Sequence, residues 1–287
     1  MQDNVTKQYR IGGLVWELTG PDFMENEKLE PFSVQGQQAD LSVKIALADT
    51  PSPSQLPLLH RDIYTEYHGE GDRRERVVYL EGKGTVLLSE REEESGNRTV
   101  ALARDGLVYY GTNLAMRILD IPYQILRHGG VFLHASYILV DGKAILFTAP
   151  KQTGKSTQAA LWEKHRRAEV INGDRALLRR LDGVWQACGS PYCGTSDICQ
   201  NHQAPIRAVV VLGQAKENRV ALTSVREAMA ALLNGCTYAT WDRSQVETVV
   251  DLAGQIITEV PIIKLDCVPD ESAVCALEEF LWELETK

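Results

Sequence analysis

Short apolar stretches separated by turn residues dominate the first hundred positions of the chain. Five of these stretches are rich in β-branched or aromatic residues, which favour strands. They cover residues 14–18, 41–45, 63–67, 77–80 and 85–88. Turn-forming residues such as Gly82-Lys83-Gly84 separate them, and the charged run Glu90–Asn97 predicts a solvated hairpin tip. The pattern predicts a small β-rich N-terminal domain over residues 1–112.

A helical spacing of apolar residues follows this β-rich stretch. The residues that fall on one helical face are Leu114, Ile118, Ile121 and Ile125. Asn113 is a suitable N-cap, and Pro122 predicts a kink or break inside the helix. Gly129-Gly130 predicts its end. This segment is therefore expected to join the first domain to the second.

The pattern changes again from residue 131. Two apolar runs, residues 131–135 and 137–140, precede Asp141-Gly142, and a third run covers residues 144–148. Asp-Gly between apolar runs is a strong hairpin signal. The third run is almost continuously apolar, which is typical of a central strand buried on both faces.

The rest of the chain alternates predicted helices and strands. Helices are expected over residues 156–168, 224–233, 245–259 and 270–284. Strands are expected over 169–172, 206–212 and 262–265, with a hairpin over 177–185 that turns at Asp182-Gly183. This alternation predicts an α/β or α+β domain with a mixed sheet over residues 113–287.

Composition and charge limit the binding partners and the location that we expect for the protein. The chain has 287 residues, 44% of them hydrophobic, and a formal net charge of −9. An acidic chain is a poor ligand for nucleic acid or for an anionic membrane, so neither partner is expected. No apolar run reaches the length of a membrane span, and the first residues lack the apolar core of a signal peptide. We expect a cytoplasmic protein.

The six cysteines fit this expectation as reduced thiols rather than disulfides. Cys188, Cys193 and Cys199 cluster along the chain, at spacings that do not match the Cys-x-x-Cys pairs of zinc sites. They are interpreted as loop and strand cysteines.

Candidate chemistry concentrates directly after the apolar run 144–148. A phosphate-binding loop needs a buried strand, a tight turn, a helix whose first amides face the anion, a lysine, and a hydroxyl for Mg²⁺. Gly154, Lys155 and Ser156 stand in that order between a predicted strand and a predicted helix. Ala149 replaces the usual first glycine, and Pro150 pre-sets a turn. The predicted nucleotide-binding residues are Ala149, Pro150, Lys151, Gln152, Thr153, Gly154, Lys155, Ser156 and Thr157.

The order of these features resembles a known family. A histidine on a strand (His134), an Asp-Gly hairpin, the phosphate loop, a helix and a short strand ending at Asp174 are similar to the bacterial HPr kinase/phosphorylase family. The resemblance extends to relatives with the phosphoenolpyruvate-carboxykinase-like nucleotide fold, including kinases found beside peptide natural-product clusters. It covers about residues 128–285 and is most specific around 131–178.

The resemblance implies ATP-dependent and Mg²⁺-dependent phosphorylation of a Ser or Thr hydroxyl in a protein or peptide. Lys155 would bind the β- and γ-phosphates, Ser156 would hold Mg²⁺, and Asp174 would act as base or metal ligand. His134 matches a family histidine near the reacting phosphate.

This chain departs from the family at two places. Gly173-Asp174 stands where the family has two aspartates, and Gly189–Ser196 replaces a segment that supplies a metal-binding glutamate. Asp174 would therefore act without a second carboxylate.

The residues themselves support several roles. Asp174 would orient the attacking hydroxyl, with its side chain near the phosphate loop if strand 169–172 lies beside strand 144–149. Arg175 would stabilise transferred charge or pair with a surface carboxylate. His134 would be a second base or a hydrogen-bonded core histidine. The segment 189–196 would line the acceptor side or serve as a connector.

Three functions remain open at the level of sequence. The first is a kinase of proteins or peptides, the second a kinase of a small molecule such as free serine, and the third a nucleotide-binding regulatory module without catalysis. ATP is the expected donor, GTP remains an alternative, and the oligomeric state is open, a homo-oligomer included.

Overall fold

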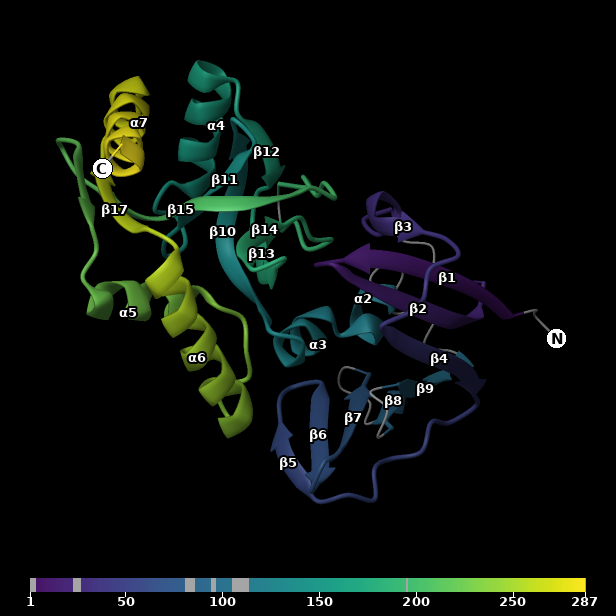
Figure 1. Ribbon diagram of the computed structural model, residues 1–287. Coiled ribbons are helices and arrows are strands. Elements are labelled where there is room, and N and C mark those ends of the chain that lie inside the picture. Colours follow the sequence, from purple (N-terminus) through teal and green to yellow (C-terminus); the bar gives the residue numbers. More distant parts are fainter. Residues whose placement is uncertain are drawn as a thin grey trace. The chain divides into compact units, whose positions relative to one another are not determined.

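The computed structural model describes residues 4–22, 27–80, 86–93, 97–104, 114–194 and 196–286 (Figure 1). The chain divides into two compact units, Met1–Ile121 and Pro122–Lys287. The predicted domain boundary at residue 112, the predicted N-cap Asn113 and the predicted turn Gly82-Lys83-Gly84 lie outside the described residues. No helix of the described ranges is long and apolar enough to cross a membrane.

The first unit is built on a mixed sheet. Its described strands follow the order β3-β1-β2-β4-β9-β8-β7-β6-β5. They are β1 (Asn4–Ile11), β2 (Leu14–Pro21), β3 (Ser33–Val34), β4 (Leu41–Ala48), β5 (Leu58–Arg61), β6 (Thr65–Glu70), β7 (Arg73–Tyr79), β8 (Val86–Glu92) and β9 (Arg98–Ala103). β4 pairs in parallel with β2 and with β9, and the other pairs are antiparallel.

The five predicted strands are present, with shifted ends. The largest shift is at residues 63–67, because Ile63 is 85% exposed and precedes β6. The sequence pattern missed β1, whose polar residues give little apolar alternation, and also β3, β5 and β9. A 3-10 turn, η1 (Glu30–Phe32), buries Phe32 in this unit.

The predicted solvated hairpin tip Glu90–Asn97 starts too early, and its first residue is not solvated. Glu90 lies on β8 and is buried, with Oε1 3.1 Å from Nη1 of the buried Arg98. Burial alone would raise the pKa of the Glu90 carboxyl, but the charges of Arg76 and Arg98 hold it below its usual value. Arg98 also donates to the carbonyls of Ile118 and Leu119 at the end of α2 (Leu114–Leu119). A buried carboxylate paired in this way is a structural group.

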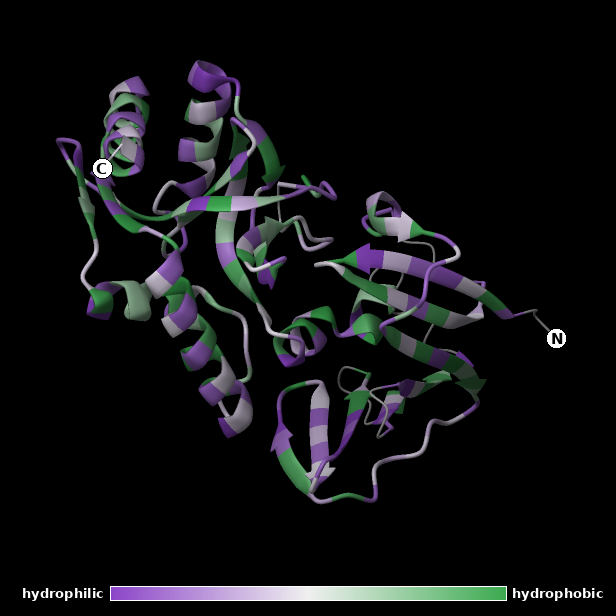
Figure 2. Cartoon of the chain, in the orientation of Figure 1, coloured by the Kyte–Doolittle hydropathy of each residue, from purple (hydrophilic) through white to green (hydrophobic). Residues whose placement is uncertain are grey.

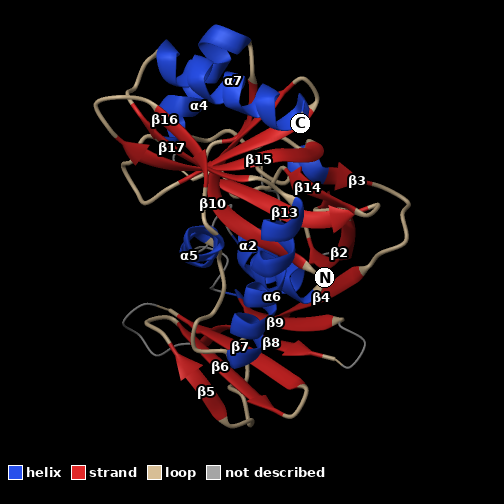
Figure 3. Ribbon diagram, turned by 60° about the vertical axis from the view of Figure 1, so that its left-hand side comes forward, coloured by secondary structure: helices blue, strands red, loops and turns tan. Residues whose placement is uncertain are grey.

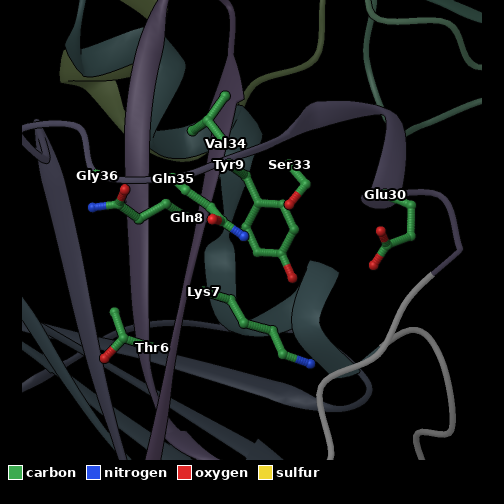
Figure 4. A pocket seen from close by; sticks show the side chains of 9 residues that line it. All are labelled: Thr6, Lys7, Gln8, Tyr9, Glu30, Ser33, Val34, Gln35 and Gly36. Atoms are coloured by element: carbon green, nitrogen blue, oxygen red, sulfur yellow. The ribbon is translucent and has the colours of Figure 1, made fainter.

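A hollow of about 450 Å³ lies on the first unit beside β1 and β3 (Figure 4). Lys7, Tyr9 and Glu30 are among its walls. Burial, together with the charge of Glu30, raises the pKa of the Tyr9 hydroxyl to about 12. Tyr9 is therefore a neutral phenol at physiological pH.

The predicted helical segment is broken before Pro122, not at it. α2 ends at Leu119, Asp120 has a left-handed φ of 47°, and α3 (Ile121–Arg127) follows. Pro122 is the second residue of α3, where a missing N–H costs no intrahelical bond. The predicted stop is confirmed at Gly129, whose φ is 73°, but Gly130 already begins the next strand.

The second unit is built on an eight-stranded mixed sheet, counted over its described residues. Its strands are β10 (Gly130–Val140), β11 (Lys143–Thr148), β12 (Glu169–Asn172), β13 (Arg175–Leu181), β14 (Val184–Cys188), β15 (Gln203–Gln214), β16 (Arg219–Leu222) and β17 (Ile262–Cys267). β15 is parallel to both β11 and β17. The two predicted runs at 131–140 are one long strand, and β16 was not predicted.

β10 connects two parts of this sheet. Its first half pairs with β13, whereas its second half lies between β11 and β12. The hairpin turn between β10 and β11 is confirmed, because Asp141 and Gly142 both have positive φ, 49° and 74°. Asp182 and Gly183 repeat this geometry between β13 and β14.

Helices cover both faces of the central strands. α4 (Lys155–Arg166) and α7 (Glu271–Thr286) pack on one face, against a core that includes Phe147 and Trp162. α5 (Val225–Gly235) and α6 (Arg243–Glu259) contribute to the core of the other face. Figures 1 and 3 show these two pairs on opposite sides of the strands, and Figure 2 shows hydrophobic and hydrophilic bands along α6. The predicted cap of α5 is confirmed, because Ser224 forms a reciprocal capping box with Glu227.

Candidate functional site

The candidate phosphate loop connects β11 to α4 across residues 149–154. Gly154 caps α4 with a φ of 112°, a conformation that side chains with a Cβ rarely adopt. The space where its Cβ would stand is open, so the backbone there can be approached closely. Gln152 also has a positive φ, and its carbonyl accepts from Gln214 Nε2 at the end of β15. The loop therefore turns tightly into the N-terminus of α4, where free helical amides attract anions.

Lys155 is buried at the start of α4. Its Nζ donates to the carbonyl of Ala149 at 3.0 Å and contacts that of Pro150 at 3.4 Å. Thr153 closes the loop further by donating from Oγ1 to the same Pro150 carbonyl. Burial lowers the pKa of the Lys155 ammonium, while the nearby Asp174 carboxylate opposes this shift. The ammonium thus sits inside the loop, within electrostatic reach of Asp174.

Other predicted loop residues are more open. Lys151, Ser156 and Thr157 are exposed. Ser156 and Thr157 belong to the first turn of α4, so their hydroxyls start beside the loop.

The position of β12 differs from the expected one. The strand does not pair with β11, because β10 lies between them and is antiparallel to both. β11 and β12 consequently run in the same direction, and their last residues, Thr148 and Asn172, lie at the same edge. Asp174 therefore reaches the vicinity of the loop across β10 rather than from an adjacent strand.

His134 lies beside Asp174 on this edge. Its Nδ1 is 3.1 Å from the Asp174 carbonyl oxygen and 3.4 Å from the carboxylate Oδ1. The Ala135 amide donates to the same carbonyl, and Thr148 Oγ1 donates to the carbonyl of His134. Because a carbonyl only accepts, Nδ1 must carry the proton, which leaves Nε2 of a neutral ring as an acceptor.

Charge around His134 favours that neutral ring. Burial lowers the pKa of its imidazole, and the ammonium of Lys155 lowers it further. The Asp174 carboxylate acts in the opposite direction but does not reverse the shift. Loop lysine, strand histidine and strand-end aspartate thus form one electrostatic group, although they come from three segments of the chain.

Arg175 faces the same group. Its Nε lies 3.4 Å from Asp174 Oδ2, and its Nη1 donates to the hydroxyl of Thr237. The Arg175 side chain is only part-buried, so solvent reaches part of it. The structure places the predicted Arg175 beside Asp174, as an ion pair within the site.

The sequence pattern missed the role of Asn172. This fully buried side chain accepts through Oδ1 from the amides of Asp174 and Arg175, at 2.9 and 2.8 Å. Its Nδ2 donates to the carbonyls of Ser190 and Tyr192. It fixes both the turn that carries Asp174 and the next loop. An Asn at a strand end before Gly-Asp is a turn signal that points to this role.

The loop after β14 packs directly on Asp174. A Cβ added to Gly194 would lie 2.6 Å from Asp174 Cγ, and one added to Gly173 would lie 2.5 Å from Ser196 Cβ. Gly173 therefore has no room for a side chain while Ser196 holds its place. The packing of this loop therefore leaves no space for a second aspartate at position 173.

Oxygen atoms are the candidate metal ligands at this site. No group of three or more His, Cys, Asp or Glu that would hold a metal ion occurs among the described residues. The Ser156 hydroxyl and the Asp174 carboxylate are hard oxygen donors, which suit Mg²⁺ when the remaining ligands come from phosphate and water.

Comparisons with known proteins show similarity at the level of solved structures. No family model matches the chain, and no curated protein matches it. Among solved structures, the chain is similar to the HPr(Ser) kinase/phosphatase from Coxiella burnetii, over 54% of this chain and 94% of that one. The two share 12% sequence identity, with a TM-score of 0.32. The function considered below rests on the residues of the site itself.

Proposed function

We propose that the second unit is an ATP-dependent and Mg²⁺-dependent kinase that phosphorylates a Ser or Thr hydroxyl of a protein or peptide. The observation that carries this proposal is the meeting of a tight loop at a helix N-terminus with Lys155, His134 and Asp174. Anion binding requires only the loop and the lysine. The acceptors at Asp174 and His134 add what phosphoryl transfer to a hydroxyl needs.

The loop residues 149–157 would hold the phosphates of ATP. Open space beside Gly154 and its left-handed φ fit a close approach of phosphate oxygens to the backbone. Lys155 would exchange its contacts with the Ala149 and Pro150 carbonyls for phosphate oxygens. Mg²⁺, held by Ser156 and Asp174, would supply charge neutralisation on the transferring group.

Two groups are available to receive the proton of the acceptor hydroxyl. The Asp174 carboxylate is part-exposed and held by Asn172 through the backbone. His134 Nε2 is an acceptor because Nδ1 donates to Asp174. We assign the orienting base to Asp174 and the neighbouring acceptor to His134. Arg175 would face charge that develops on the transferred phosphoryl group.

Transfer assays separate this function from its alternatives. Purified protein is incubated with ATP and Mg²⁺, and ADP formation is compared with no acceptor, free serine, or mixed Ser/Thr peptides. We expect acceptor-dependent ADP formation with peptides, and phosphate on a hydroxyl by mass spectrometry. Transfer to free serine alone would replace the proposal by a small-molecule kinase. ATP binding without transfer to any acceptor would replace it by a regulatory module.

A further inference from the structure

Two cysteine sulfurs lie close together in the loop that packs on Asp174. Cys193 Sγ and Cys199 Sγ are 2.8 Å apart, and neither residue is in a disulfide. A disulfide holds its sulfurs about 2.05 Å apart, so bond formation needs a shift of less than about 1 Å. Cys193 is buried and Cys199 is half-buried, so one thiol is shielded and the other is within reach of solvent.

We propose that Cys193 and Cys199 are a redox modification site, which low-molecular-weight disulfides convert reversibly into an intramolecular disulfide beside Asp174. The chemistry is thiol–disulfide exchange. The Cys199 thiolate attacks the small disulfide, forms a mixed disulfide and releases one small thiolate. The Cys193 thiolate then attacks Cys199 Sγ and releases the second. Two protein thiols lose two electrons and two protons, and the small disulfide becomes two thiols.

The surroundings select this pair over the other cysteines. Cys188 and Cys236 are enclosed, and burial raises the pKa of each thiol to about 12, which suppresses the reactive thiolate. Cys275 is exposed on α7, where Arg166 Nη2 contacts its sulfur. Among the described cysteines, only Cys193 and Cys199 have their sulfurs in contact with each other.

The backbone already holds both ends of the pair in place. The Asn172 side chain donates to the Tyr192 carbonyl beside Cys193, and Asn172 pairs with Cys199 as an isolated bridge. The Gln200 amide donates to the Ile171 carbonyl. Little chain entropy remains to be lost when the two sulfurs join, so the reduced geometry favours the bond.

A consequence for catalysis rests on the proposed function. Between the cysteines, Gly194 packs on Asp174 and Ser196 packs on Gly173. The part-exposed Asp174 carboxylate therefore lies against the segment that joins the two cysteines. The disulfide closes it into a ring, so oxidation should lower transfer to peptides several-fold while ATP affinity stays unchanged, because the phosphate loop is a separate segment.

The experiment treats the full-length protein with oxidised and reduced glutathione at graded ratios, followed by acid quenching, alkylation and peptide mass mapping. We expect a Cys193–Cys199 cross-linked peptide lacking two hydrogens, reversed by dithiothreitol. Cys193→Ser should instead accumulate a glutathione adduct on Cys199. Cys275→Ser is the matched control and should form the cross-link like the wild type. A wild-type protein that stops at the Cys199 adduct, pairs other cysteines or stays reduced overturns the proposal.

Activity is measured on the same samples, with Cys193→Ser as the variant that cannot form the bond. Lower peptide transfer only in the cross-linked wild type supports the consequence for Asp174, and equal transfer in both redox states removes it. Absence of transfer in every sample would contradict the kinase function, while the mass map would still decide the disulfide.

Discussion

At the scale of residues, the site depends on side chains that hold the backbone as much as on those that face a ligand. Three residues hold Asp174 in position through hydrogen bonds to its main chain, namely Asn172, Ala135 and His134. Thr148 and Ser136 tie the neighbouring strands together at the same edge, through the carbonyls of His134 and Gly173. Two kinds of substitution should therefore impair catalysis: those that remove the Asp174 carboxylate and those that remove the hydrogen bonds holding Asp174 in place.

Replacing Asp174 by Asn should separate binding from chemistry. The amide keeps the shape but is a poor proton acceptor, so transfer should fall by roughly 10²- to 10⁴-fold. ATP affinity measured without Mg²⁺ should change much less, because Lys155 and the loop amides remain. Steady-state transfer and calorimetric ATP binding measure the two quantities. Full transfer by Asp174→Asn would remove Asp174 from the role of base.

Replacing Asn172 by Ala should lower the stability of the turn that carries Asp174, although Asn172 itself is not assigned a contact with ATP or the acceptor. The amides of Asp174 and Arg175 would lose their buried acceptor, at a cost of about 1–3 kcal/mol of unfolding free energy for each unsatisfied group. Asn172→Asp keeps Oδ acceptors but loses the donation to Ser190 and Tyr192, so it should recover part of the activity. Thermal melts and transfer rates test both. An Asn172→Ala protein with wild-type stability and transfer would contradict this positioning role.

The imidazole of His134 should titrate below its ordinary pKa of about 6.5. Nitrogen-detected NMR of the ring should show a neutral Nδ1–H tautomer at pH 7, with protonation only in more acidic solution. The signs of two variants follow from the charges that act on the ring. Lys155→Met removes a positive charge and should raise this pKa, whereas Asp174→Asn removes a negative charge and should lower it. A wild-type pKa above 6.5 would contradict the described surroundings.

The sequence pattern identified the loop and the candidate acceptors but not what supports them. Gly154 and Lys155 were recognisable because strand, loop and helix follow one another along the chain. Thr148 and Thr237 act through contacts between distant segments, as does the donation from Asn172 to Ser190 and Tyr192, and single-sequence spacing carries no such information.

At the scale of elements, the order of β11, β10 and β12 decides how the site is assembled. Local patterns predicted most strands, but β12 was expected beside β11 when β10 lies between them. Pairing between distant strands is set by packing rather than by local pattern, which explains this error. Turn chemistry was more reliable, since Asp141-Gly142 and Asp182-Gly183 specify their hairpins by positive φ.

The loop after β14 should make a second carboxylate at position 173 harmful. Gly173→Asp would place Cβ within 2.5 Å of Ser196 Cβ, so the variant should melt at lower temperature and transfer less phosphate. Ser196→Gly removes the obstructing side chain, and the double variant should recover stability relative to Gly173→Asp alone. Melting curves of the three variants measure this coupling. A stable, more active Gly173→Asp protein would show that the loop does not restrict this position.

At the scale of the whole molecule, the chain combines a sheet unit rich in structural ion pairs with a helix-covered unit that contains the candidate site. The global charge of −9 does not describe this site, where Lys155 and Arg175 face Asp174. Composition alone therefore gave only expectations about partners and could not locate a candidate phosphate site.

Nucleotide binding by the loop is the central claim, and calorimetric titration of ATP with Mg²⁺ into the full-length protein tests it most directly. Lys155→Met is compared with Lys164→Met, which removes an exposed lysine near the other end of the same helix. We expect Lys155→Met to weaken ATP binding by at least about tenfold, or 1.4 kcal/mol, and Lys164→Met to bind as the wild type does. Wild-type protein that does not bind ATP, or equal affinities for wild type and Lys155→Met, would contradict the account.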